Sequence, residues 1–182
     1  MAYFNRGTAA LHLGGAQNAY DDYSAALKLK PNFARALAAR GAILVGQQKF
    51  DLAIADLTKA ISIDAKLSAA YSNRGMAYIA KGDKAKAIAD FNQAVNLDPT
   101  DAASYSARGS AYAMSGDNDR ALADFSKAIA MNPKLTVAIF NRGKVYLAKG
   151  DKAKAKADFE AVLAITPDNQ NAKDALKALA GS

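Results

Sequence analysis

Arginine and aspartate are the reactive side chains that recur along this chain at a fixed spacing. An arginine stands at every 34th residue, and an aspartate follows each of them 16 residues later. The arginines are Arg6, Arg40, Arg74, Arg108 and Arg142, and the aspartates are Asp22, Asp56, Asp90, Asp124 and Asp158. A guanidinium and a carboxylate can form a two-point ion pair. The spacing therefore predicts five structural ion pairs that fix the register of neighbouring elements.

Other reactive side chains are too few to build an active site. The chain has one histidine, His12, one glutamate, Glu160, and no cysteine. A metal site needs three or four converging ligands. The Gly14-Gly15 pair has neither the preceding strand nor the following Gly-Lys-Ser/Thr of a phosphate loop. We expect no catalytic residue, no metal site and no cofactor, and we expect that the protein is not an enzyme.

The paired arginines and aspartates belong to a larger repeated unit of 34 residues. We count the repeated glycine of each unit as position 8: Gly7, Gly41, Gly75, Gly109 and Gly143. The residues at positions 20 and 27 are then small, and the residue at position 24 is bulky. Glycine at position 15 and proline at position 32 interrupt most units, so each unit should contain two helices. Apolar residues also follow one another in steps of three and four, and no stretch alternates with period two. This pattern predicts an all-α fold in which large side chains fit against small ones.

These columns resemble the tetratricopeptide repeat (TPR) family. The third unit fills every family position with Tyr71, Gly75, Tyr78, Ala87, Phe91, Ala94 and Pro99, and the fourth unit does so with Tyr105, Gly109, Tyr112, Ala121, Phe125, Ala128 and Pro133. Unit two departs at Gln48 and Ala65, and unit one has Ala10 in place of a tyrosine. The resemblance implies a right-handed α-solenoid of helix-turn-helix units spanning 1–33, 34–67, 68–101, 102–135 and 136–169.

The two ends of the predicted stack differ. Residues 170–180 alternate apolar and charged faces and predict a capping helix, which completes a single domain over 1–182. The chain opens inside its first predicted helix, which leaves Tyr3 on an uncapped edge. We therefore expect the natural protein to extend further at the N-terminus, and the edge favours a homo-oligomer.

The resemblance implies that function lies on the concave side of the stack, at positions 2, 5, 6, 9, 12 and 13 of each unit. The candidate peptide-binding residues are Phe4, Asn5, Thr8, Arg35, Ser72, Asn73, Met76, Ser106, Ser110, Phe140, Asn141 and Lys144. The side chains of this surface are mostly apolar and small. It suits an apolar peptide or an amphipathic helix, with Met76 and Met114 as adaptable contacts.

Asparagine recurs at position 6, as Asn5, Asn73 and Asn141, in alternate units. One hypothesis is that these amides hold an extended peptide backbone, since an amide can both donate and accept. The other is that each only bonds a neighbouring helix. The residue types leave both open.

One known TPR binding mode is missing from this chain. The carboxylate clamp of chaperone-binding TPR domains uses lysine, arginine and asparagine at set positions. Around Asn73 those positions hold Ala38, Ala42, Ala103 and Ala107. We do not expect the chain to bind the acidic tails of chaperones in that way.

Composition limits the partners and the compartment. The net charge is +7, but the lysines near residues 81–86 and 149–156 alternate with aspartates, so a solvated convex face explains them and we expect neither nucleic acid nor a membrane as a partner. No signal peptide and no run of 18 apolar residues is visible. The lack of cysteine fits the cytoplasm and the bacterial periplasm equally.

The sequence thus predicts a soluble, bacterial, non-enzymatic protein-interaction scaffold that binds a protein or peptide ligand in its concave groove. The alternatives are a self-assembling structural module and the TPR arm of a larger enzyme. The residues name neither the partner nor the biological process.

Overall fold

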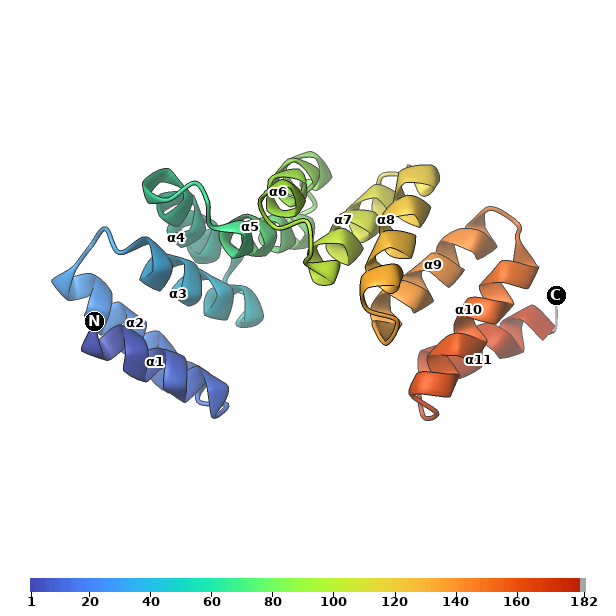
Figure 1. Ribbon diagram of the computed structural model, residues 1–182, viewed down its shortest axis with the longest axis horizontal. Helices are drawn as coiled ribbons and strands as arrows, with labels where there is room; N and C mark the ends of the chain where they lie inside the picture. Colours follow the sequence, from blue (N-terminus) through green and yellow to red (C-terminus); the bar gives the residue numbers. More distant parts are fainter. Residues whose placement is uncertain (181–182) are drawn as a thin grey trace. The chain divides into compact units, whose positions relative to one another are not determined.

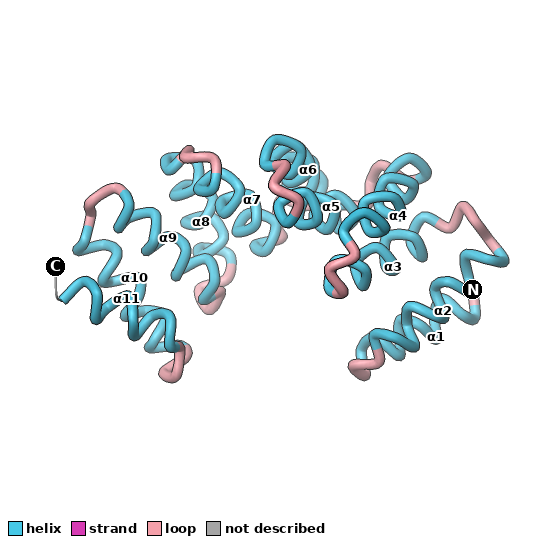
Figure 2. The backbone as a smooth tube through the Cα atoms, turned by 180° about the vertical axis from the view of Figure 1, so that it is seen from behind, coloured by secondary structure: helices cyan, strands magenta, loops and turns pink. Residues whose placement is uncertain are grey.

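The computed structural model describes residues 1–180, which form helices joined by short loops and contain no strand (Figures 1 and 2). The all-α prediction is confirmed. The helices are α1 (Ala2–His12), α2 (Ala16–Leu29), α3 (Ala34–Gly46), α4 (Phe50–Ile63), α5 (Ser68–Ala80), α6 (Lys84–Leu97), α7 (Ala102–Met114), α8 (Asn118–Met131), α9 (Thr136–Ala148), α10 (Lys152–Ile165) and α11 (Gln170–Ala180). They pair into helical hairpins, α1 with α2 and so on to α9 with α10.

The helices fall into two compact units. Unit 1, Met1–Pro99, holds the three hairpins from α1 to α6, and unit 2, Thr100–Ser182, holds two hairpins and α11. The single domain over 1–182 stays a prediction. Gly181 and Ser182, the end of that predicted domain, lie outside the described residues.

Left-handed residues end the first helix of each hairpin. Gly14, Gly82, Gly116 and Gly150 have φ between 81° and 84°, a conformation that suits glycine because it has no Cβ. Gln48 occupies the same turn position with φ 60°. Glutamine in place of glycine in the second 34-residue repeat, 34–67, has therefore not changed the turn, although it places a side chain in an unfavourable backbone region.

Aspartate begins the second helix of three hairpins. Asp83, Asp117 and Asp151 each accept a hydrogen bond from the backbone N–H three residues later, at 3.0 or 3.1 Å. Such caps satisfy an amide that the helix itself leaves unpaired.

The core of each hairpin is formed by the columns read from the sequence. The alanines at position 20 are fully buried, and so are the bulky residues at position 24: Tyr23, Leu57, Phe91, Phe125 and Phe159 are at most 1% exposed. The glycine at position 8 faces this bulky residue. A Cβ on Gly75 would lie 2.8 Å from a ring carbon of Phe91. The expected fit of large against small side chains is confirmed.

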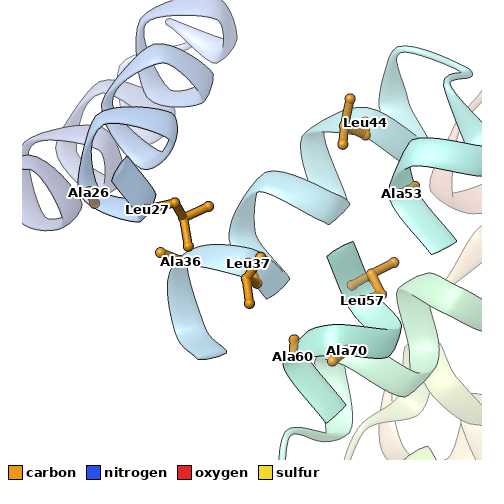
Figure 3. Packing of buried hydrophobic residues seen from close by; sticks show 9 residues of the cluster. All are labelled: Ala26, Leu27, Ala36, Leu37, Leu44, Ala53, Leu57, Ala60 and Ala70. Atoms are coloured by element: carbon orange, nitrogen blue, oxygen red, sulfur yellow. The ribbon is translucent and has the colours of Figure 1, made fainter. Parts of the chain in front are cut away.

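Neighbouring hairpins share their cores within each unit. Figure 3 shows one such cluster in unit 1, where Leu27 of α2, Leu37 of α3 and Leu57 of α4 pack with small residues that include Ala70 of α5. In unit 2, Ala172 of α11 is buried against Phe159 and Val162 of α10. The predicted helix over 170–180 is thus present and covers the last hairpin.

Candidate functional site

The candidate binding face consists of the first helices of the hairpins, α1, α3 and α5 in unit 1 and α7 and α9 in unit 2. Helices α3 and α5 contact each other directly, as do α7 and α9. Small residues at the facing positions allow this approach. The side chains at positions 2, 5, 6, 9, 12 and 13 of these helices are called the groove face.

The structure brings every repeated arginine together with the aspartate 16 residues later. In each hairpin Nε donates to one carboxylate oxygen and Nη2 to the other, at 2.5 to 2.9 Å. The hydrogen bond to Asp90 is the main cause that raises the pKa of Arg74 above its ordinary value. These guanidinium groups therefore brace the two helices of a hairpin and are committed to the fold.

The third nitrogen of the guanidinium, Nη1, donates to a residue of the preceding hairpin, which the sequence analysis missed. Nη1 of Arg40 donates to Ser24 at 3.2 Å, that of Arg74 to Thr58 at 3.0 Å, and that of Arg142 to Ser126 at 3.2 Å. The signal was present as a column of hydroxyl and amide residues at position 25 of the first four repeats: Ser24, Thr58, Asn92 and Ser126. Arg40, Arg74 and Arg142 thus each tie their own hairpin to the one before.

A second set of ion pairs lies at the turns. Three cations pair with the capping aspartate three residues earlier: Lys86, Arg120 and Lys154. Each of them also lies over the ring of the tyrosine at position 11 of its repeat, 4.6 to 5.4 Å from the ring centroid. The side-chain hydrogen bond from Arg120 is the main cause that lowers the pKa of Asp117 below its ordinary value of 3.8. These cations therefore stabilise the turns between the two helices of a hairpin.

The predicted groove residues of α1 and α3 divide between core and surface. Phe4 is half-buried, with its ring centroid 5.5 Å from that of Tyr23 and 4.8 Å from that of Phe33. Asn5 and Arg35 are exposed, and together with Phe4 they line a pocket of about 380 Å³. Thr8 donates to the Phe4 carbonyl oxygen at 3.0 Å. Phe4 is therefore mainly a core residue that shows one edge to the groove face.

On α5 the groove face is half-buried. Ser72 and Asn73 are partly covered, and Met76 is 40% exposed. The Asn73 amide donates to the carbonyl oxygen of Ala69 in its own helix at 2.8 Å. This contact uses one of the two amide hydrogens.

In unit 2 the structure gathers some predicted residues and buries another. Ser106 is only 5% exposed, so it offers almost no surface to a ligand, although its position in the repeat predicted it on the groove face. Phe140 is half-buried against Phe159, with 5.4 Å between ring centroids. Ser110, Asn141 and Lys144 line one pocket, and the Asn141 amide donates to Ser110 Oγ at 3.4 Å.

The remaining reactive residues do not form a site. The exposed His12 ring lies 2.8 Å from the carbonyl oxygen of Thr8 in its own helix. Within residues 1–180, His, Asp and Glu side chains form no group of three or more that could hold a metal ion. None of the helices described is long and apolar enough to cross a membrane.

Repeated helical hairpins with conserved internal spacing define a helical-repeat protein. The chain belongs to the tetratricopeptide repeat family: models described as "Tetratricopeptide repeat" match residues 2–33, 34–67 and 112–179, and a model described as "TPR repeat" matches 75–116. Proteins of this family and fold are typically non-enzymatic interaction scaffolds. No curated protein sequence matches the chain.

Solved structures include similar TPR proteins. YrrB, described as a TPR protein with an unusual peptide-binding site, is 23% identical with a TM-score of 0.77, over 96% of this chain and 90% of that one. MamA is 26% identical with a TM-score of 0.76, over 87% of this chain and 93% of that one. A tetratricopeptide repeat protein from Parabacteroides merdae ATCC 43184 is 26% identical with a TM-score of 0.71, over 98% and 70%.

Proposed function

We propose that the groove face binds a peptide or an amphipathic helix of a partner protein, and that the chain works as an adaptor without a chaperone-type carboxylate clamp. The observation that carries this proposal is the chemistry of the face. It has no acidic side chain at any of the six groove positions, and it leaves large apolar groups such as Met76, Val137 and Leu147 at 39 to 53% exposure. Exposed apolar groups beside a few polar ones are typical of binding surfaces.

The half-buried amides support the same proposal. Asn73 and Asn141 each spend one amide hydrogen on the fold, which leaves the carbonyl oxygen and a second hydrogen for a ligand backbone. The two hypotheses for this column are therefore compatible: an asparagine can bond its own protein and a peptide at once.

The paired surface cations support a protein ligand rather than a polyanion. Lys81 pairs with Asp51 and Lys149 with Asp119, each at 2.5 Å, and Lys154 pairs with Asp151 at 2.7 Å. Cations that are already balanced add little to the counterion release that drives nucleic-acid binding.

The test compares a groove variant with a matched control. The groove variant carries Asn73→Ala, Met76→Ala, Asn141→Ala and Lys144→Ala, and it spares Phe4 and Phe140 because their loss would disturb the core. The control carries Gln93→Ala, Asn96→Ala, Leu97→Ala and Lys127→Ala on exposed sites of second helices. Peptides selected from a random display library against the parent chain should lose binding to the groove variant and keep it to the control. Equal binding to both variants contradicts the proposal.

Self-assembly is a second candidate function, favoured by the exposed apolar residues in α1 and at its two ends. Met1 is 85% exposed and Leu13 89%, and Tyr3 is 41% exposed under the Arg6 guanidinium. If this edge joins copies, the apparent mass in light scattering should rise with concentration and fall again in a Tyr3→Glu, Leu13→Glu variant. A constant monomer mass contradicts this candidate.

A further inference from the structure

A pocket of about 380 Å³ lies between α7 and α9, and its lining combines two kinds of side chain. Met114, Val145 and Ala148 supply apolar surface, and Ser110, Asn141 and Lys144 supply polar groups. Pockets that bind small ligands or side chains hold roughly 300–1,000 Å³. This space is therefore large enough for one side chain of a bound peptide and the backbone beside it.

The polar side of this pocket consists of hydrogen-bond donors and one cation. Lys144 carries three N–H donors and a full charge, and Asn141 carries an amide, whereas the Ser110 hydroxyl donates its hydrogen to the carbonyl oxygen of Ser106 at 3.0 Å. None of the residues that line the pocket is acidic. The lining thus offers a positive, donor-rich wall beside an apolar one.

The charge of Lys144 is not balanced by the chain as far as the structure describes it. Lys144 is exposed and forms no ion pair with any residue from 1 to 180. The two aspartates that flank the pocket residue Asn118 are already engaged: Asp117 pairs with Arg120 and Asp119 with Lys149. Lys144 therefore differs from Lys81, Lys86, Lys149 and Lys154, which each have an acidic partner.

Resting on the peptide-binding function above, we infer that the α7–α9 pocket binds an acidic side chain, aspartate or glutamate, from the interior of the bound peptide, with an aliphatic neighbour on the apolar wall. The carboxylate is the chemical complement of an unbalanced ammonium group supported by the amide of Asn141. Met114 adapts to the neighbouring aliphatic group because its side chain is flexible.

The carboxylate comes from a side chain and not from a chain end because the groove face continues past the pocket in both directions. Along α9, Phe140 lies one turn before Lys144 and Leu147 one turn after it, and both are groove positions that are not fully buried. A peptide backbone can pass the pocket on both sides, and one lysine matches one side-chain charge.

The experiment selects peptides and then reverses the charge of the pocket. A random twelve-residue library, fused to its carrier so that no free C-terminus is displayed, is selected against the parent chain, against Lys144→Glu and against Lys127→Glu. Lys127 is an exposed lysine of α8 outside the pocket, so its variant makes the same charge change elsewhere. The parent and Lys127→Glu should enrich acidic residues next to aliphatic ones, and Lys144→Glu should enrich lysine or arginine at that place.

The strength of the contact follows from titration of the best peptide, synthesised with acetyl and amide ends, by fluorescence anisotropy. Replacing its acidic residue with the amide analogue should weaken binding about two- to fivefold, as should Lys144→Gln, because the pair is partly solvated. Combining both changes should weaken binding no further than either alone. Circular dichroism should show the same helicity and melting temperature for all variants.

Three outcomes would overturn the inference, and they are distinguishable. Enriched peptides without acidic preference, or the same peptides for the parent and Lys144→Glu, remove the carboxylate pocket but leave the peptide-binding function in place. Tighter binding when an amide-substituted peptide is given a free C-terminus assigns the carboxylate to a chain end. No enriched peptide at all contradicts the peptide-binding function itself, and the pocket assignment with it.

Discussion

Arg74 on α5 and Asp90 on α6 form a two-point ion pair in which Nε donates to Oδ2 and Nη2 to Oδ1, both at 2.8 Å. The two side chains are only 16% and 7% exposed. Such a pair fixes the two helices relative to each other. Removing one of its members destabilises the fold, because the other charge is then buried without a partner.

Removing either member of this pair should destabilise the protein. We expect Asp90→Ala and Arg74→Ala each to lower the free energy of unfolding by about 2–3 kcal/mol, since each leaves a half-buried group without its partner. The double variant should lose clearly less than the sum of the two. Urea denaturation measures all three free energies, and their difference gives the coupling.

The exposed pair of Lys81 and Asp51 is the control, with side chains 43% and 83% exposed. Its coupling energy should stay below about 1 kcal/mol because water screens it. Additive effects at Arg74 and Asp90 would show that the pair is not a stabilising unit.

Replacing Gln48 with glycine should stabilise the chain. Gln48 holds φ 60°, while the equivalent glycines hold 81° to 84°. The left-handed conformation costs a residue with a Cβ about 1–2 kcal/mol, part of which is offset by the greater freedom of glycine in the unfolded chain. We expect a net gain of about 0.5–1 kcal/mol in urea denaturation. The reciprocal change, Gly116→Ala, should lose a similar amount, and a neutral result for both would contradict the strain.

Two glycine-to-alanine changes should have opposite signs. At Gly75 the new Cβ would lie 2.8 Å from the Phe91 ring, whereas at Gly46 no atom lies within 4 Å. Overpacking should make Gly75→Ala destabilising by about 1–3 kcal/mol. Gly46→Ala, at the end of α3, should be neutral or stabilising by up to about 1 kcal/mol because alanine favours helix. Thermal unfolding of both variants measures the two changes in stability. A stabilised Gly75→Ala variant would show that the hairpin is loosely packed.

Acid should weaken the caps of α6, α8 and α10. Side-chain hydrogen bonds from Lys86, Arg120 and Lys154 lower the pKa of Asp83, Asp117 and Asp151, respectively, below the ordinary 3.8. A lowered pKa in the folded state means that the caps stabilise the fold fully above the unfolded value and lose this contribution as the pH falls through the folded one.

A triple Asp→Asn variant at these caps keeps a cap acceptor but removes the titration. Its stability should fall less steeply than that of the parent as the pH drops below about 4. Asp174→Asn, which removes an exposed carboxylate that caps no helix, should leave the slope of the parent unchanged. Parallel slopes for the triple variant and the parent would contradict the role of the ionised caps.

Repeat spacing predicted the hairpins and the partners of the arginines, because residues at equal distances from a turn must lie across from each other. The bond from Nη1 of Arg74 was not predicted, since Thr58 and Arg74 belong to different 34-residue repeats and only the packing of one hairpin against the next brings them together. The groove face was predicted as a set of positions, but not the burial of Ser106 or the packing of Phe4 against Phe33. Exposure at those positions depends on how closely two neighbouring hairpins approach, which no single repeat encodes.

The triple engagement of Arg40, Arg74 and Arg142 has a consequence for how such a chain can change in length. Each of these repeats places a guanidinium against the hydroxyl at position 25 of the repeat before it. A whole repeat that is gained or lost therefore keeps the spacing of such partners, while an insertion of any other size between two partners would change it.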